Sequence, residues 1–392
     1  MFSFYCEELA LYEVVSLSYS PLRARICQAL LETFDIKTNN DGLTLATRTD
    51  LGQFHSDNYL AMLQIVSDLW VFDDDDKTGK RRKSEAKLVR ERLLKFNLDL
   101  PFEGENSIFP GMFTYNRLCA TGSLAAARML IDGKYKIAIN WYGGHSRARK
   151  AQAGHGCFIN DSVLACLYLL TKFDRVLHIS IDKEHCDGVE EAFYSSDRVA
   201  TVSFHEALSS GTGDEDDSGY GKGQGYAVNI PLESAAFTDE HFVPFFTEVV
   251  RKAQTFFSPN VIVLLLCPSV LAGNRYSTLN LSLKGYLDCL EAVKILDAPL
   301  LLLGGSSTSV PIAAKAWCVA TAHCLGKNLI GKEIPEDSLF SEYFAESFKL
   351  DVPQLEIYEQ PDLELLNAKK SKVLEKLTVK IPVKQEPMMT LS

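Results

Sequence analysis

The sequence lacks an excess of positive charge. Its 392 residues include 40 lysines and arginines against 51 aspartates and glutamates, which gives a formal net charge of −11 at pH 7. Proteins bind nucleic-acid phosphates and anionic membranes mainly through lysine and arginine side chains. This balance therefore argues against direct binding of nucleic acid or of an anionic membrane surface.

Long apolar runs and paired cysteines are also missing. No stretch reaches the roughly 18–20 apolar residues that a membrane-spanning helix needs. Residues 1–20 lack a basic segment followed by an unbroken apolar stretch, so they do not resemble a signal peptide. The ten cysteines include no CxxC pair, and several lie within apolar runs, where a free cysteine behaves as a small core residue. We expect a soluble protein of a reducing compartment, the nucleus or the cytosol.

Hydrophobic periodicity is what the sequence does contain. Apolar residues recur at helical spacing in residues 22–34 and 60–70, which predicts two amphipathic helices. Farther along, short β-branched runs alternate with helical segments, and we expect strands at residues 136–140, 175–181, 199–204, 226–230, 260–266 and 300–303. Several of these runs are apolar on both faces, which is typical of a parallel sheet covered by helices on both sides. The predicted fold class is α/β, a single domain with a central, mostly parallel sheet flanked by helices on both faces.

Two segments do not follow this core pattern. Residues 73–90 begin with four aspartates and continue with the basic cluster at residues 80–83, so we expect an exposed loop. The basic cluster matches a nuclear import signal, but such runs are also common on solvated surfaces, which is the interpretation that we favour. We therefore expect one domain over residues 1–350 and a partly disordered extension over residues 351–392, with a disordered tail from residue 374. Lys384 in that tail fits the pattern for SUMO conjugation, a match that also arises by chance.

Several short segments resemble the class I histone deacetylases. The matching segments are Asn140-Trp141 with Gly143-Gly144, Asn160-Asp161, Asp187-Gly188-Val189-Glu190-Glu191, Ser203-Phe204-His205 and Gly211-Thr212-Gly213-Asp214. They follow one collinear register that extends from Tyr12 to Asp351. The resemblance implies the arginase/deacetylase fold. It also implies hydrolysis of acetyl-lysine by a zinc ion that two aspartates and one histidine hold and that activates water.

The metal ligands of that family are incompletely matched. The resemblance places the first aspartate ligand on Asp182 and the histidine ligand on Glu184, whereas residues 266–273, where the third ligand should lie, contain no carboxylate. A glutamate can bind zinc, but its added negative charge makes a metal-bound water less acidic and less nucleophilic. We therefore expect no cofactor, and zinc bound to a vestigial site formed by Asp182 and Glu184 is the alternative.

The catalytic and substrate-binding positions have also changed. The tandem histidines that act as base and proton shuttle fall on Ser146 and Arg147, and the tyrosine that stabilises the oxyanion falls on Thr308. The aromatic wall of the substrate tunnel falls on Gly156, and the substrate-clamping aspartate falls on Glu105. Metal, base and oxyanion donor act as a unit in catalysis, so once one of them is missing the groups that remain catalyse little. The resemblance thus predicts a pseudo-deacetylase.

Three functions are consistent with these residues. The leading hypothesis is a catalytically inactive nuclear or chromatin protein that uses the deacetylase fold as a binding surface, for example for corepressor subunits. A related hypothesis is a regulatory subunit that pairs with an active deacetylase paralogue. The alternative is a weakly active, metal-dependent lysine deacetylase with a site rebuilt from Asp182, Glu184, His145 or His185, using zinc or another divalent metal. Zinc content and turnover separate the enzyme from the two binding functions.

Overall fold

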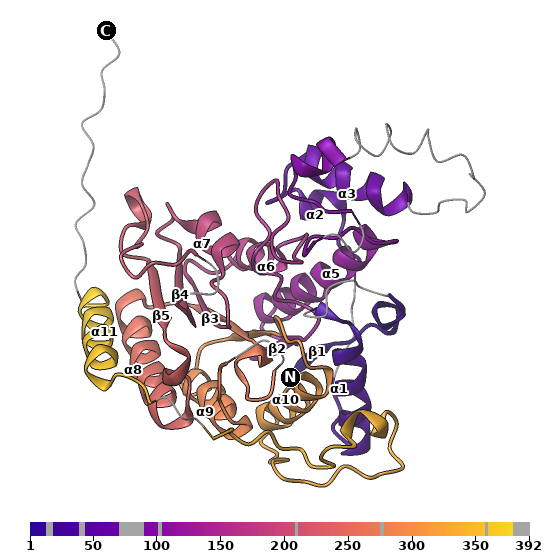
Figure 1. Ribbon diagram of the computed structural model, residues 1–392. Coiled ribbons are helices and arrows are strands. Elements are labelled where there is room, and N and C mark those ends of the chain that lie inside the picture. Colours follow the sequence, from indigo (N-terminus) through magenta and orange to yellow (C-terminus); the bar gives the residue numbers. More distant parts are fainter. Residues whose placement is uncertain are drawn as a thin grey trace.

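A seven-stranded parallel sheet runs through the centre of the molecule (Figure 1). Its strands lie in the order β1-β2-β7-β6-β3-β4-β5. The computed structural model describes residues 1–12, 19–38, 44–69, 90–100, 104–207, 211–274, 278–356 and 360–378. The strands are β1 (Phe2–Phe4), β2 (Ile137–Asn140), β3 (Val176–Ile181), β4 (Val199–Glu206), β5 (Ala227–Leu232), β6 (Val261–Leu266) and β7 (Leu300–Leu303).

The register of the sheet aligns the carboxyl ends of its central strands. Ile181, the last residue of β3, pairs with Phe204 of β4 and with Leu266 of β6. On the other side of β6, Leu265 pairs with Leu303, the last residue of β7. The loops that follow β3, β6 and β7 therefore leave the sheet side by side at one edge, which is where open α/β sheets bind ligands.

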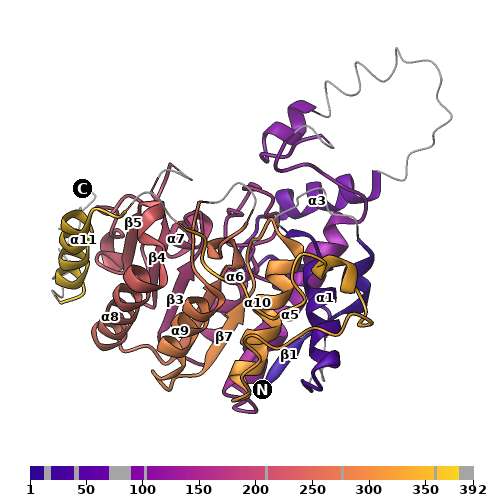
Figure 2. The same cartoon turned by 60° about the horizontal axis from the view of Figure 1, so that its bottom comes forward.

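Helices cover both faces of the sheet. The helices of the molecule include α1 (Leu22–Thr33), α2 (Arg48–Leu51), α3 (Asp57–Leu69), α5 (Met112–Ile131), α6 (Asp161–Leu169), α7 (Asp187–Phe193), α8 (Asp239–Phe257), α9 (Leu283–Lys294), α10 (Val310–Cys324) and α11 (Leu363–Lys376). Helices α8, α9, α10 and α1 pack in succession as one layer, while α5, α6 and α7 pack in succession as the other (Figure 2). None of the helices in the described ranges is long and apolar enough to cross a membrane.

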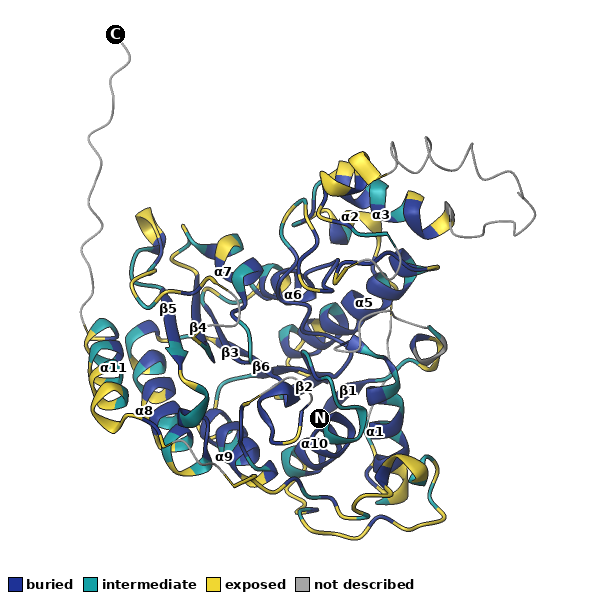
Figure 3. Ribbon diagram, viewed as in Figure 1, coloured by how far each residue is buried: buried dark blue, intermediate teal, exposed yellow. Residues whose placement is uncertain are grey.

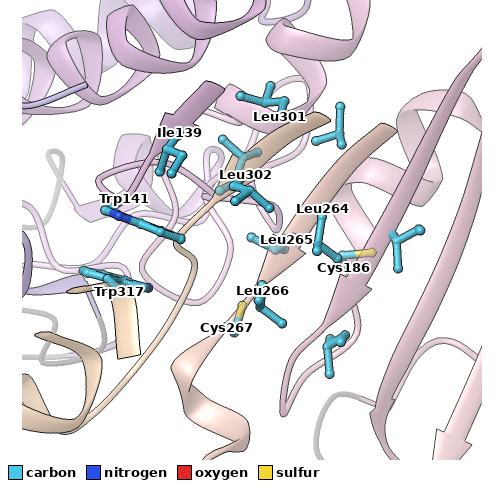
Figure 4. Close-up of a cluster of buried hydrophobic side chains, with 14 of the residues drawn as sticks. Ile139, Trp141, Cys186, Leu264, Leu265, Leu266, Cys267, Leu301, Leu302 and Trp317 are labelled. Carbon is cyan, nitrogen blue, oxygen red and sulfur yellow. The ribbon is translucent and has the colours of Figure 1, made fainter. Parts of the chain in front are cut away.

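The core lies between the sheet and these two helix layers. Every residue of β6 is buried, and buried residues gather in the sheet and on the inner sides of the helices, whereas exposed ones lie on the outer surface (Figure 3). At the end of β2, the ring of Trp141 stacks on that of Trp317 from α10, with centroids 5.6 Å apart and planes 7° from parallel (Figure 4). The indole of Trp141 also donates a hydrogen bond to Thr321 at 2.9 Å, so its polar edge is satisfied inside the core.

The predicted α/β class and the parallel sheet are confirmed. Each of the six predicted strands is present, with ends shifted by two residues at most, and the two predicted helices correspond to α1 and α3. Strand β1 was not predicted, because three residues are too short to show a periodic pattern. Its strand character comes from pairing with β2, which lies far along the chain.

The extension after residue 351 contains a helix that was not predicted. Asp362 caps the start of helix α11, because its carboxylate accepts hydrogen bonds from the backbone N–H groups of Glu364 and Leu365. The helix packs on α8 and β5. Its Lys370 pairs with Glu248 of α8. The expected disordered tail from residue 374 thus starts within this helix, which ends at Lys376. Residues 70–89, with the basic cluster, and residues 379–392, with Lys384, lie outside the described residues.

Four of the histidines buried in or beside this core have a lowered pKa. Burial lowers the pKa of His55, His145 and His178 from 6.5 to about 4, and burial together with the nearby His185 lowers the pKa of His205 to about 3. The cause is desolvation, which penalises the charged imidazolium. His178, within β3, is fully buried, and neither of its ring nitrogens has a hydrogen-bond partner. These histidines are therefore neutral in the folded protein at neutral pH.

Stability should fall on mild acidification. Between pH 6.5 and pH 4 the unfolded chain binds protons that the folded chain does not, so the free energy of unfolding decreases as pH falls through this window. Each histidine contributes up to about 1.4 kcal/mol per pH unit. Between pH 7 and pH 5, we predict that the free energy of unfolding falls by about 1–2 kcal/mol less in His178→Leu than in the wild type, as measured by urea denaturation. Equal losses in the two proteins would contradict this origin of the acid sensitivity.

Candidate functional site

The candidate site lies at the carboxyl ends of four neighbouring strands. Asp182 directly follows β3, Ser269 follows β6 and Ser306 follows β7, while Arg147 lies in the segment after β2. The strand order places β2, β7, β6 and β3 next to one another. Segments that are far apart in the sequence therefore meet here.

The segment after β2 is anchored by a buried carboxylate. Asp161, at the start of α6, accepts the backbone N–H groups of Gly144 at 2.9 Å and of His145 at 2.8 Å, and the hydroxyl of Ser123 at 2.5 Å. Gly144 has a φ of +96°, and a Cβ there would lie 2.6 Å from the backbone nitrogen of Gly305. The loops after β2 and β7 thus touch at a point where only glycine fits.

The backbone on either side of Arg147 is fixed as well. The side-chain amide of Asn160 donates to the carbonyl of Ser146 at 3.0 Å and to that of Ala148 at 2.8 Å. A Cβ at Gly188, near the start of α7, would lie 2.6 Å from the Ala148 carbonyl oxygen, so α7 is packed closely against this segment. The side chain of Arg147 therefore leaves from a backbone that has little freedom to move.

Hydroxyl groups surround Asp182. Its side chain is 3% exposed, and its Oδ1 accepts hydrogen bonds from the hydroxyls of Ser269 at 2.6 Å and Ser306 at 2.9 Å. The backbone N–H of Lys183 donates to the same oxygen at 2.7 Å. These three donors hold the carboxylate by hydrogen bonds. Ser269 and Ser306 were not singled out from the sequence. Their positions just after the predicted strands β6 and β7 could have pointed to them, because these strand ends meet at the same edge of the sheet as Asp182.

Arg147 and Glu184 form the central ion pair of the site. The side chain of Arg147 is 3% exposed, and its guanidinium contacts the carboxylate of Glu184, which is 31% exposed. The Nε of Arg147 lies 3.5 Å from an oxygen of Asp187. Arg149 donates to the other oxygen of Asp187 at 3.1 Å and lies 3.2 Å from Glu191. The buried positive charge is thus compensated by carboxylates that follow β3 and begin α7.

The outer end of this network carries the positions predicted for substrate binding. Nδ1 of His155 lies 2.8 Å from a carboxylate oxygen of Glu105 and 3.7 Å from one of Glu184. Burial, and then the positive charge of Arg147, lowers the pKa of His155. Gly156 has a φ of +79°, a conformation that disfavours any side chain, and its N–H donates to Asn106 at 2.9 Å. Glu105 and Gly156 therefore lie on the same rim, beside the Arg147–Glu184 pair.

The two histidines of the rebuilt-site alternative lie in different surroundings. His145 contacts the rings of Tyr19 and Tyr115, with centroids 4.6 Å and 6.5 Å away, and neither of its nitrogens has a hydrogen-bond partner. With its pKa lowered to about 4, it is a weak base. Both nitrogens of His185 already have partners, Glu190 at 3.3 Å and Thr212 at 3.1 Å.

These residues do not match the donor set of a zinc site. A catalytic zinc needs three donors aimed at one point, with a fourth position left for water. Here Oδ1 of Asp182 is held by two hydroxyls and an N–H group, and Glu184 contacts a guanidinium. Within the described ranges, no three His, Cys, Asp or Glu side chains are grouped to hold a metal ion. Thr308, the predicted oxyanion position, lies half-buried in the segment between β7 and α10.

The anchoring carboxylate gives a test of this geometry. Asp161→Ala leaves three buried donors without their acceptor, and each unpaired donor costs about 1–3 kcal/mol. We predict a free energy of unfolding lower by at least about 3 kcal/mol, measured by urea denaturation. The control is Asp132→Ala at the end of α5, where the carboxylate is 54% exposed and the loss should stay below about 1 kcal/mol. Similar losses in both variants would rule out the anchoring role.

Comparisons with known proteins place the chain in a family. A family model described as a histone deacetylase domain matches residues 18–324. Histone deacetylase 7 of Arabidopsis thaliana is 36% identical over 343 residues, which cover 87% of this chain and 80% of that protein. Histone deacetylase 1 of Homo sapiens is 36% identical over 335 residues, which cover 85% of this chain but only 65% of that protein. With this match and the parallel α/β fold, the chain belongs to the histone deacetylase family.

Proposed function

We propose that this chain is a pseudo-deacetylase, a histone deacetylase family protein that does not hydrolyse acetyl-lysine and acts by binding protein partners in the nucleus. The observation that carries the proposal is the ion pair between Arg147 and Glu184. By the resemblance, these residues stand where the family has a proton-shuttle histidine and a metal-ligand histidine. A guanidinium stays protonated at neutral pH, so Arg147 cannot accept a proton from water.

The other parts of the reaction are also unsupported. General-base catalysis needs a group of suitable pKa within hydrogen-bond reach of the attacked water, and the hydroxyl of Ser146 is not such a base. Thr308 is shorter than a tyrosine by a whole ring, and losing an oxyanion donor costs about 10²–10³ in rate by itself. The metal that would activate water has no matching donor set around Asp182 and Glu184. We infer that the chain uses no zinc or other cofactor.

A binding function is consistent with what has been retained. The family match extends over residues 18–324, and the chain forms a seven-stranded parallel sheet although, by the resemblance, the reactive positions differ. We propose corepressor subunits or an active deacetylase paralogue as partners, because the chain retains the fold of proteins named for their action on histones. The net charge of −11 argues against direct binding of nucleic acid or of an anionic membrane surface.

Zinc content and turnover test the missing activity. We predict that the purified full chain contains no stoichiometric zinc by elemental analysis. We also predict that any turnover of an acetyl-lysine peptide is the same in Asp182→Ala, with an active deacetylase of the family as the positive control. Stoichiometric zinc together with turnover that Asp182→Ala abolishes would contradict the proposal and support a rebuilt, weakly active metal site.

The proposed partners need a separate experiment. We predict that the tagged full chain, isolated from nuclear extract, enriches corepressor subunits or an active deacetylase relative to an unrelated tagged protein, as measured by quantitative mass spectrometry. Deacetylase activity in the isolated material would then belong to the partner and persist with the Asp182→Ala chain. If the chain is nuclear but none of these proteins is enriched, the proposed partners are wrong.

A further inference from the structure

We propose that the guanidinium of Arg147 is a tethered cation that replaces the metal ion of this site, both as the positive charge that holds the strand-end segments together and as the group that keeps a divalent metal out. This inference rests on the proposed function, since it concerns the same site. It explains how carboxylates can be retained at the carboxyl edge of the sheet in a chain that has lost the zinc ligands of its family.

The first argument is charge compensation. Among the side chains of the described ranges, those within ion-pair distance of Glu184 are Arg147 and His155. Nδ1 of His155 lies 3.7 Å from Glu184 but only 2.8 Å from Glu105, so Glu105 is its nearer partner. Arg149 is occupied by Asp187 and Glu191. Arg147 is therefore the cation that compensates Glu184.

The second argument is that one group bridges separate segments. A metal ion stabilises a fold by joining ligands that come from different parts of the chain. Arg147 comes from the segment after β2, Glu184 from the segment after β3, and Asp187 from the first turn of α7. Because the Arg147 side chain is almost fully buried, these contacts are little screened by solvent.

The third argument is that the cation cannot easily move aside. Asn160 holds the carbonyls of the residues before and after Arg147. A Cβ at Gly154 would lie 2.5 Å from the Arg147 carbonyl, so that neighbouring segment also packs directly on its backbone. A divalent ion that used Glu184 as a ligand would have to displace a guanidinium built on this fixed backbone. The same ion would also have to compete for Asp182, because the hydroxyls of Ser269 and Ser306 already donate hydrogen bonds to its Oδ1.

A set of full-length variants tests this inference without reference to activity. Arg147→Met keeps an unbranched, flexible stem but leaves Glu184 without its cation, and the melting temperature should fall by about 5 °C or more. The matched control is Arg149→Met, which makes the same charge change on a side chain that is 40% exposed and should shift the melting temperature by less than about 2 °C. Equal shifts in the two variants would overturn the proposal.

A double variant keeps the test decisive if Arg147→Met does not fold. In Arg147→Met/Glu184→Gln, both charges of the pair are gone, so the double variant should fold and melt above Arg147→Met. A double variant that is no more stable than Arg147→Met would show that the arginine does not act through Glu184, and the proposal would be wrong.

Metal titration tests the exclusion. Isothermal titration calorimetry with zinc chloride should give the same result for the wild type and for Glu184→Gln, because Glu184 should not bind zinc. A single zinc site that Glu184→Gln abolishes would overturn the proposal, because arginine and metal would then not compete. If the chain is inactive and free of zinc but Arg147→Met behaves like Arg149→Met, the inference fails and the pseudo-deacetylase proposal stands.

Discussion

A guanidinium buried at the carboxyl edge of a sheet needs carboxylates beside it, because an uncompensated charge in that position would cost several kcal/mol. In this protein Arg147 meets that condition with Glu184 and Asp187, which come from the segment after β3 and the first turn of α7. The arrangement depends on the loop anchors, since Asp161 and Asn160 fix the backbone from which the arginine leaves. The candidate site is therefore organised around one ion pair.

The fold persists because most of its stability comes from the core and not from that edge. The sheet is held by strands such as β6, which is buried along its whole length, and by helix layers on both faces. The free energy gained by hydrophobic burial is proportional to the apolar area that is buried, and it does not depend on the chemistry of the strand-end loops. A family fold can thus keep its core and its loop geometry while the groups that would perform the reaction are replaced.

The sequence predicted those parts of the molecule whose pattern is local. Strand β6 is apolar on both faces, and the resemblance to the family placed Glu184 at the position of a metal-ligand histidine. Helix α11 was missed because Val373 is its one buried residue, so it has little apolar periodicity, and its packing on α8 and β5 is not visible in its own sequence. The contact between Arg147 and Glu184, and the hydroxyl donors Ser269 and Ser306 around Asp182, were missed because parallel strands bring together residues that are far apart in the chain.

The most direct test of this account is a crystal structure of the full chain grown in the presence of zinc, with anomalous diffraction data collected on both sides of the zinc absorption edge. The account predicts electron density for the Arg147 guanidinium against Glu184 and no zinc peak between Asp182 and Glu184. A zinc peak with Asp182 and Glu184 as ligands, and with Arg147 turned away from them, would contradict it.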